Sequence, residues 1–280
     1  MSKDSKTLVL LDAHAIIHRS YHALPEFLSS KGEPTGALYG LSSMLMKIIS
    51  ELKPDYIVAC YDLPQKTFRH EAYDGYKAGR AKTEEALVTQ LKDSRIIFEA
   101  FGIPTYDSPG FEADDVLGTI VEKYKKEKNF KIIIASGDMD TMQLVDDKKV
   151  QVYTLKKGIN DTILYDEDAV VKRFGFKPKF LPDYKGLRGD PSDNIIGIKG
   201  IGEKTDTTLV TTFGTIEEIY KNIKKNQGVL QKTGLSPRII ELIKNNEEEA
   251  LFSKTLAKIR TDAAIDFVLP SKTFFTSSVK

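Results

Sequence analysis

The sequence predicts an α/β fold in which a mostly parallel sheet is flanked by helices. Three short apolar runs predict strands, at residues 7–11, 56–61 and 131–135. Each run is apolar throughout, which is typical of strands buried on both faces of a parallel sheet. Between the runs, apolar residues at helical spacing in 38–52 and 87–101 give the alternation of a doubly wound domain.

Composition limits the class of protein. The 280 residues suffice for a large core and two lobes, and 41 basic residues nearly cancel 40 acidic ones. Any nucleic-acid surface must therefore come from local segregation of charge. The single cysteine, Cys60, excludes a disulfide framework and a cysteine-rich zinc site. The N-terminus has no apolar stretch as long as a signal core or membrane span, so we expect a cytoplasmic protein without a membrane partner.

Carboxylates follow each of the three predicted strands. Asp12 and Asp62 end the first two runs, and Asp138 and Asp140 follow the third. In doubly wound sheets, ligands gather at the carboxyl ends of the strands. One Asp after a strand is ordinary turn chemistry. Three strands that end this way indicate a shared site.

A further acidic group begins a predicted helix after the turn at residues 108–110. Apolar spacing from Val116 onward places Glu112, Asp114 and Asp115 in the first helical turn. The helix dipole favours acidic residues there by about 0.3–1 kcal/mol each, so a capped surface helix is the simpler interpretation. Clustered carboxylates nevertheless repel one another unless a cation lies among them. Beside the acids at the strand ends, this group indicates a metal site.

Three histidines follow Asp12 at a spacing of four, at His14, His18 and His22. Such pairs can bind zinc on a helix. No Glu follows His14 or His18 as in the HExxH motif, and each histidine has core-like neighbours. Histidines with internal partners, or facing the substrate, are the favoured interpretation.

Residues 66–82 interleave cations with aromatic rings. Four of these residues recur at helical spacing and would share one face: Arg69, Tyr73, Tyr76 and Arg80. Lys77 lies beside that face, and such a pattern suits a phosphate backbone with bases stacked nearby. Gly75 and Gly79 each cost about 1 kcal/mol in a helix. We therefore predict a mobile arch at about 64–95 that orders with substrate, and a solvated charged connector is the alternative.

A glycine-rich hairpin follows two more carboxylates, Asp190 and Asp193. Glycines at 197, 200 and 202 permit positive φ, and a helix start at Thr205 would aim free N–H groups at an anion. A P-loop is excluded because Glu203 follows Gly202, and a dinucleotide motif because Thr205 replaces its last glycine. A hairpin that grips a phosphodiester backbone between two helices fits better.

The domain organisation follows from these patterns. Residues 1–180 are predicted as the α/β core, with a further strand at 150–155. Residues 181–267 are predicted as a small helical DNA-binding subdomain. Residues 268–280 carry no clear element and are predicted as a tail.

With these pieces in place, the chain resembles the bacterial 5′-nuclease domain of DNA polymerase I, a relative of flap endonucleases with a PIN-like core. The match runs from Leu8 to about Phe267, and the joint order of its motifs is specific. These motifs are Asp12 after the first strand, Tyr61-Asp62, and residues 76–80, 112–115, 136–140, 189–194, 197–205 and 256–262.

The resemblance implies two groups of metal ligands. The first group is Asp12, Asp62, Glu112 and Asp114, and the second is Asp115, Asp138, Asp140, Asp190 and Asp193. Carboxylates without cysteine favour two or more hard ions, Mg²⁺ or Mn²⁺. A pair of such ions about 3.5–4 Å apart activates water and stabilises the leaving oxygen of a phosphodiester.

The resemblance also implies roles in DNA recognition. Lys77 and Arg80 would face the scissile phosphate, and Tyr76 would stack near the cleaved nucleotide. The glycine hairpin resembles a helix–three-turn–helix element, which holds duplex DNA downstream, often with a K⁺ ion. The residues expected to contact DNA are Arg69, Tyr73, Gly197, Lys199, Gly200, Gly202, Lys204 and Thr205.

The implied function is a structure-specific 5′ nuclease, both 5′-3′ exonuclease and 5′-flap endonuclease, in primer removal and repair. Its expected partners are DNA with 5′ ends, flaps or RNA primers, and a DNA polymerase region in cis or trans, with a monomer as the active form. One alternative is a DNA-binding paralogue that has lost catalysis. A ribonuclease of the related acidic-site class would leave the glycine hairpin unexplained, and a phosphatase with Asp12 as nucleophile would want a second Asp where His14 stands.

Two positions depart from the family pattern. Ala13 follows Asp12 where many relatives carry Gly, which is a mild change. Asp206 stands where relatives usually have a small Ala. We predict that its carboxylate points towards the phosphate track and weakens duplex binding relative to Asp206→Ala.

Overall fold

The structure, a computed structural model, describes residues 5–157, 161–226, 228–271 and 273–274. The chain forms two compact units. The first comprises residues 1–67, 82–166 and 260–280, and the second comprises residues 68–81 and 167–259. Within the described ranges, no helix is both long and apolar enough to cross a membrane.

These units differ from the predicted ranges of 1–180 and 181–267. Residues 68–81 and 167–180 belong to the helical unit, and the chain from residue 260 onward returns to the sheet unit. Apolar periodicity identifies helices but does not show which unit a helix packs against. The boundaries between the two units could therefore not be predicted from it.

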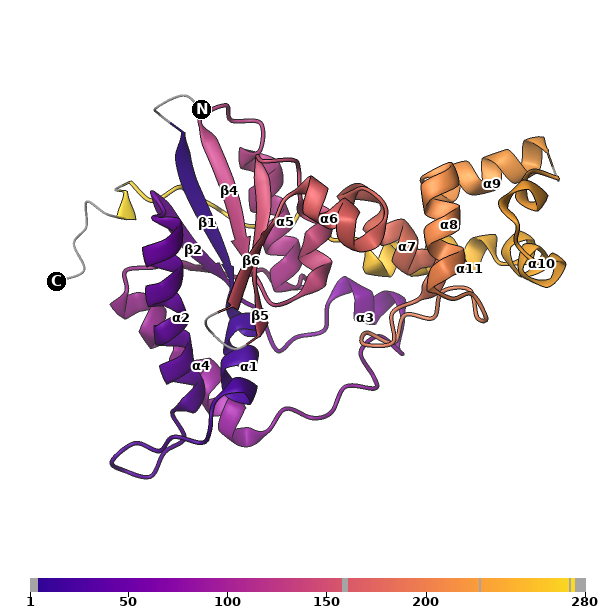
Figure 1. Cartoon of the computed structure of the whole chain (residues 1–280). Coiled ribbons are helices and arrows are strands. Elements are labelled where there is room, and N and C mark those ends of the chain that lie inside the picture. Colours follow the sequence, from indigo (N-terminus) through magenta and orange to yellow (C-terminus); the bar gives the residue numbers. More distant parts are fainter. Residues whose placement is uncertain (1–4, 158–160, 227, 272, 275–280) are drawn as a thin grey trace. The chain divides into compact units, whose positions relative to one another are not determined.

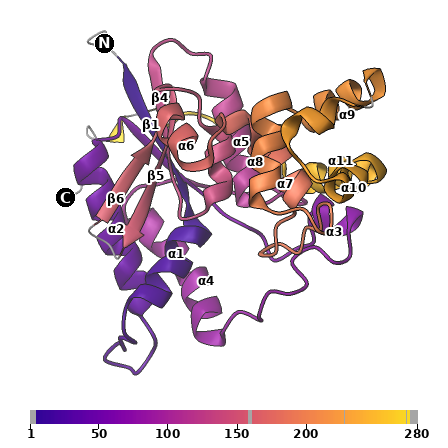
Figure 2. The same cartoon turned by 45° about the vertical axis from the view of Figure 1, so that its right-hand side comes forward.

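The first unit is built on a six-stranded sheet of order β3-β2-β1-β4-β5-β6. Its strands are β1 (Lys6–Asp12), β2 (Tyr56–Cys60), β3 (Thr105–Tyr106), β4 (Phe130–Ala135), β5 (Val150–Lys157) and β6 (Asp161–Tyr165). All neighbours pair in parallel except β5 and β6, which form an antiparallel pair at one edge (Figure 2). The mostly parallel sheet and four predicted strands are confirmed, whereas β3 and β6 were not predicted.

Helices cover both faces of this sheet (Figure 1). One face carries α1 (Ala13–Ala23), α2 (Gly36–Leu52) and α4 (Glu85–Ala100), and the other carries α5 (Ala113–Tyr124). Val9 and Leu11 of β1 pack in the core cluster that includes α1 and α2, while Leu8 and Leu10, which point the opposite way, are equally buried. Covering on both faces explains why the strands are apolar throughout.

The order of the strands creates a switch point beside β1. From β1 the chain adds β2 and then β3 on one side, and it then crosses to place β4 on the other side of β1. Doubly wound sheets bind ligands in the crevice outside the carboxyl ends of the strands at such a point. Here these ends are Asp12 of β1 and Ala135 of β4, followed by the 3₁₀ helix η1 (Met139–Leu144).

The second unit is helical (Figure 1). Its elements are α3 (Phe68–Ala72), α6 (Glu167–Phe174), η2 (Pro178–Phe180), α7 (Leu181–Arg188), α8 (Glu203–Phe213), α9 (Ile216–Lys225), η3 (Val229–Thr233), α10 (Pro237–Asn245) and α11 (Glu247–Ala257). Asp183 of α7, 2% exposed, forms an ion pair with Lys254 of α11 at 2.6 Å and accepts the amide of Ile216 at 2.8 Å. One buried carboxylate thus joins α7, α9 and α11.

The loop between α7 and α8 requires glycine at two places. Gly189 and Gly197 have φ of 82° and 64°, and a Cβ on Gly197 would lie 2.1 Å from the backbone nitrogen of Gly189. The predicted start of the next helix is two residues late, because α8 begins at Glu203 with Gly202 as its N-cap. Of the three glycines that permit positive φ, Gly197 and Gly200 use it, whereas Gly202 has a φ of −121°.

The predicted tail at 268–280 lies partly outside the described residues, which omit 272 and 275–280. Within the described part, Phe274 is 8% exposed and packs in the core of the first unit. Its amide donates to the carbonyl of Asp55 at 2.7 Å. This end of the chain therefore takes part in the fold.

Candidate active site

Asp12 lies at the switch point and is almost fully buried. It is the N-cap of α1, with Oδ1 accepting the amide of Ala15 at 3.0 Å. Its Oδ2 accepts the hydroxyl of Ser136 at 2.6 Å. The Ser136 Oγ in turn accepts the amide of Asp138 at 2.9 Å. One serine thereby connects the acids that follow β1 and β4.

Asp62 follows β2 and is held by two other elements. Its Oδ1 accepts the amide of Ala113, the first residue of α5, at 2.8 Å. Its own amide donates to Nδ1 of His14 in α1 at 3.2 Å. Burial lowers the pKa of His14, whereas the Asp62 carboxylate, whose Oδ2 lies 3.6 Å from Nδ1, raises it.

Neighbouring acids of the first unit raise the pKa values of Asp12 and Asp114. Burial raises the pKa of Asp12, and the charges of Asp62 and Asp138 raise it further. Burial also raises the pKa of Asp114 well above its usual value, followed by contributions from Asp138, Asp12, Asp140 and Asp62. Five predicted ligands, from β1, β2, α5 and the turn after β4, therefore share one electrostatic neighbourhood.

The donor chemistry of this group fits a hard divalent cation. Among the residues that the structure describes, no three or more His, Cys, Asp and Glu side chains form an arrangement that could hold a metal ion as it stands. The charges of these carboxylates raise the pKa values of Asp12 and Asp114, and carboxylate oxygens are the ligands of Mg²⁺ and Mn²⁺. A cation among them would remove the repulsion that raises their pKa values.

Glu112 and Asp115 begin α5, as predicted, but Asp115 has other partners. Glu112 is the N-cap residue, and its amide donates to Oδ2 of Asp115 at 3.0 Å. The Oδ1 of Asp115 accepts the amide of Arg260 at 2.8 Å, and the side chain is 0% exposed. Both oxygens of this predicted metal ligand thus hold backbone amides, a capping function that residue spacing did not reveal.

The remaining two predicted ligands lie in the second unit. Asp190 forms an ion pair with Lys185 and accepts the amide and the hydroxyl of Ser192 at 2.9 and 2.6 Å. Burial alone would raise the pKa of Asp190, but the charge of Lys185 and these hydrogen bonds lower it. Asp190 is therefore ionised in the folded unit.

Asp193 gathers the residues predicted to face the scissile phosphate. Arg80 forms an ion pair with Oδ1, and the hydroxyl of Tyr76 donates to Oδ2 at 3.0 Å. The Nζ of Lys77 lies 3.9 Å from the same Oδ2. The three residues are thus brought together, although Tyr76 is 4% exposed and offers little surface for stacking.

The predicted helix through this basic and aromatic segment is largely absent. The helix α3 ends at Ala72, and Lys77 has a φ of 56° within the turns that follow. Arg69 is 3% exposed and donates to the carbonyls of Leu256 and Lys258 at 2.8 and 2.9 Å. Its predicted contact with DNA is therefore wrong for this structure, in which Arg69 packs against the end of α11.

The hairpin residues predicted to contact DNA differ in exposure, and their contact with DNA stays a prediction. Lys199, Gly200, Gly202 and Lys204 are exposed, Thr205 is half-buried, and Gly197 is buried beside Gly189. Tyr73 packs edge-on against the ring of Phe252 at 6.0 Å.

Asp206 contradicts the expectation that its carboxylate points towards a phosphate track. The side chain is 0% exposed, and neither carboxylate oxygen has a hydrogen-bond partner. Burial raises the pKa of Asp206 to about 7, against the opposing charge of Arg188. The residue acts inside the helical unit, because α8 turns it towards the core and away from the surface.

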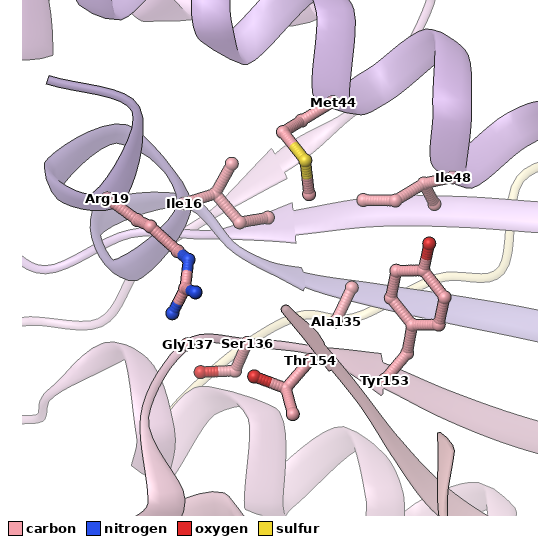
Figure 3. A pocket seen from close by; sticks show the side chains of 9 residues that line it. All are labelled: Ile16, Arg19, Met44, Ile48, Ala135, Ser136, Gly137, Tyr153 and Thr154. Carbon is pink, nitrogen blue, oxygen red and sulfur yellow. The ribbon is translucent and has the colours of Figure 1, made fainter. Parts of the chain in front are cut away.

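A small cavity beside the carboxyl end of β4 is lined by the guanidinium of Arg19, a residue that the sequence analysis did not single out. Figure 3 shows Arg19 of α1 reaching towards Ser136 and Gly137, next to Thr154. Ile16, Met44, Ile48, Ala135 and Tyr153 complete the lining. Arg19 lies seven residues, or two helical turns, beyond Asp12, and that spacing is the signal that would have found it.

Family models match the chain almost from end to end. Residues 7–175 match the model described as 5'-3' exonuclease, N-terminal resolvase-like domain. Residues 176–276 match the model described as 5'-3' exonuclease, C-terminal SAM fold. The chain belongs to the 5'-3' exonuclease family. The predicted resemblance is thereby confirmed.

Curated relatives include both long polymerases and a short nuclease. The chain is 39% identical over 264 residues to a DNA polymerase I of Bacillus caldotenax, a match that covers 94% of the chain and 29% of the relative. It is 36% identical over 261 residues to a 5'-3' exonuclease of Aquifex aeolicus, covering 93% of the chain and 84% of the relative. The chain thus spans under a third of the first relative and most of the second.

Solved structures confirm the fold. The T5 D15 protein, co-crystallised with metal ions, superposes with a TM-score of 0.73 at 20% identity, covering 91% of this chain and 90% of that one. The same phage protein, described as a flap endonuclease, in a complex with DNA and metal ions gives a TM-score of 0.71. At this identity, the likeness supports the architecture and no individual contact.

Proposed function

We propose that this chain is a structure-specific 5′ nuclease that hydrolyses phosphodiesters of DNA as a 5′-3′ exonuclease and 5′-flap endonuclease. The observation that carries the proposal is the coupled group of Asp12, Asp62, Asp114, Asp138 and Asp140 at the switch point of the sheet. Family membership supports the same reaction.

The proposed metal site uses this chain's carboxylates in two groups. Asp12, Asp62, Glu112 and Asp114 would hold one ion, and Asp138 and Asp140 would contribute to a second, with Asp115 fixing the start of α5. Asp190 and Asp193 of the helical unit are further proposed ligands. Bound Mg²⁺ or Mn²⁺ supplies water activation and charge stabilisation. The hydroxyl of Ser136 orients Asp12, since it donates to Oδ2 at 2.6 Å.

The proposed DNA contacts come from the second unit. Lys77 and Arg80 pair with Asp193 in this structure. When DNA binds, they leave Asp193 and neutralise the charge of the scissile phosphate. The exposed hairpin residues Lys199 and Lys204 contact the duplex backbone, with K⁺ as a further ion at the hairpin. The predicted arch at 64–95 is too long, because residues 85–95 form the start of α4 and Leu87 packs in the core. We propose that only the chain before α4 rearranges around single-stranded DNA.

The biological setting is part of the proposal. Relatives named DNA polymerase I, of which the chain spans under a third, support a polymerase region as partner in cis or in trans. With such a partner, the proposed role is primer removal and repair, and RNA primers are among the 5′ ends that the nuclease removes. The proposed active form is a monomer, and the proposed site of action is the cytoplasm.

A double-labelled 5′-flap duplex tests the proposal on a gel of single-nucleotide resolution. We expect cuts near the flap junction in Mg²⁺ or Mn²⁺ and none in EDTA. Asp12→Asn should abolish the cuts. Asp147→Asn is the matched control, because Asp147 is exposed and its φ of 46° is tolerated by Asn. Tight binding without cuts in either metal would instead identify an inactive DNA-binding protein.

A further inference from the structure

We infer that His14 is a positioning residue for Asp62, whose amide donates to Nδ1 of the imidazole at 3.2 Å. This role deepens the proposed function and rests on it, because Asp62 is one of the proposed metal ligands. The imidazole itself is not assigned to the metal. It acts on the site through the backbone of Asp62.

The hydrogen bond defines the tautomer of the ring. The amide of Asp62 donates to Nδ1 of His14 at 3.2 Å, so Nδ1 accepts and carries no proton. A neutral imidazole with an acceptor Nδ1 has its proton on Nε2. His14 therefore works as a hydrogen-bond acceptor in this place, which neither Lys nor Arg could provide.

The position of Asp62 explains why an acceptor is needed. The amide of Tyr61 still donates to the carbonyl of Tyr106 at 2.9 Å, and β2 itself ends at Cys60. Asp62 is the first residue beyond this ladder, and its amide points to α1 instead of to a strand. The hydrogen bond is part-buried, so we expect that removing the acceptor loosens the backbone at Asp62.

Packing fixes the ring in the required orientation. His14 meets Tyr61 edge to face, with ring centroids 5.5 Å apart. The hydroxyl of Tyr61 bonds to Ser94 at 2.7 Å, and the guanidinium of Arg95 lies over its ring at 4.2 Å. The imidazole thus rests against an aromatic ring that α4 holds in place.

Two anchors together determine the direction of the Asp62 carboxylate. His14 of α1 holds its amide, and the amide of Ala113 of α5 donates to Oδ1 at 2.8 Å. Partners that orient a metal ligand typically change metal affinity by 10–100-fold when removed. His14 is therefore predicted to act on metal affinity without being a ligand.

A Mn²⁺ titration followed by electron paramagnetic resonance, without DNA, tests this role. His14→Asn keeps an oxygen acceptor near the position of Nδ1, whereas His14→Gln moves it away and His14→Leu removes it. We expect the Kd for Mn²⁺ to rise about tenfold or more in His14→Leu and His14→Gln, and less than threefold in His14→Asn. His22→Leu, on the exposed end of the same helix, is the control and should match the wild type.

Thermal unfolding of each variant checks that it is folded under the conditions of the Mn²⁺ titration. If His14→Leu does not fold, His14→Gln alone is compared with the wild type. An unchanged Kd in His14→Gln, or the same loss in His14→Asn, overturns the inference while wild-type cleavage leaves the proposed function standing. Wild-type protein that neither binds Mn²⁺ nor cuts DNA would overturn both.

Discussion

The carboxylate of Asp115 accepts the backbone amide of Arg260, 145 residues later in the chain, at 2.8 Å. This contact begins a series between α5 and the segment after α11. Ala263 donates its amide to the hydroxyl of Thr119 at 3.0 Å, and Lys123 donates to the carbonyl of Phe267 at 2.9 Å. The returning chain is thus fastened along the helix that begins with the acidic group.

Asp115→Ala should lower the stability of the protein even when no metal is present. The substitution orphans the buried amides of Glu112 and Arg260, each at a cost of about 1–3 kcal/mol. Urea unfolding in EDTA measures the effect. Asp114→Asn is the matched control, because it relieves repulsion among carboxylates and should leave stability equal or higher. Equal stability of Asp115→Ala and wild type in EDTA would show that Asp115 acts as a ligand only.

Asp206→Ala should stabilise the protein at pH 8 and change little at pH 4. Burial raises the folded-state pKa of Asp206 from the usual 3.8 to about 7. The folded state then binds the proton more tightly than the unfolded state, so wild-type stability falls as the pH rises from about 4 to about 7. Above pH 7 the full penalty is present, and we expect a gain of about 1–3 kcal/mol on its removal.

Chemical unfolding at several pH values measures this gain. Glu248→Ala removes an exposed carboxylate of the same unit and should show no comparable pH dependence. A gain for Asp206→Ala that is the same at pH 4 and pH 8 would argue against a buried, unpaired charge.

Ser136→Ala should reduce cleavage by about 10–100-fold at limiting metal. The substitution removes the donor to Asp12 and the acceptor for the amide of Asp138. The rate as a function of Mg²⁺ concentration separates weaker metal binding from slower chemistry. Ser42→Ala, which removes a hydroxyl bonded only within α2, is expected to cut like the wild type. Full activity of Ser136→Ala at low Mg²⁺ would remove Ser136 from the site.

Asp193→Asn should strengthen the binding of a 5′-flap DNA in EDTA while abolishing cleavage in Mg²⁺. The change releases Arg80 and Lys77 from the carboxylate that they face. Each new phosphate contact steepens the dependence of log K on log salt by about 0.9. Fluorescence anisotropy across a salt series measures the slope, and weaker binding or an unchanged slope would contradict this exchange of partners.

Arg69→Ala should destabilise the second unit. At a temperature where the variant is still folded, its affinity for DNA should equal that of the wild type. It removes a buried guanidinium that bonds to the carbonyl of Leu256 in the last turn of α11 and to that of Lys258 just after it, and such charged hydrogen bonds contribute about 1.5–3 kcal/mol each. Lys199→Ala gives the opposite result, with unchanged melting and a weaker, less salt-dependent interaction with DNA. A changed salt slope in Arg69→Ala would restore its predicted DNA contact.

Much of the fold was predictable because its signals are local. Apolar runs predicted β1, β2, β4 and β5, and the helical period predicted α2 and α4 within two residues. The two-residue β3 and the five-residue β6 were missed because their apolar runs are at most three residues long. The helix predicted through Tyr76 was wrong. The structure has turns there, and a partner far along the chain, Asp193, holds the hydroxyl of Tyr76.

The sequence by itself determined the chemistry of this protein: carboxylates at the ends of parallel strands, an acidic helix start and a glycine hairpin. Strand ends and helix starts are local properties, so their joint order points to the family. Only the tertiary structure decided how individual side chains are used. It turns Arg69 and Asp206 inward, gives Asp115 to the amide of Arg260 and places His14 against the amide of Asp62. Residue spacing fixes the face of an element, but a hydrogen-bond partner depends on which distant backbone group that face meets.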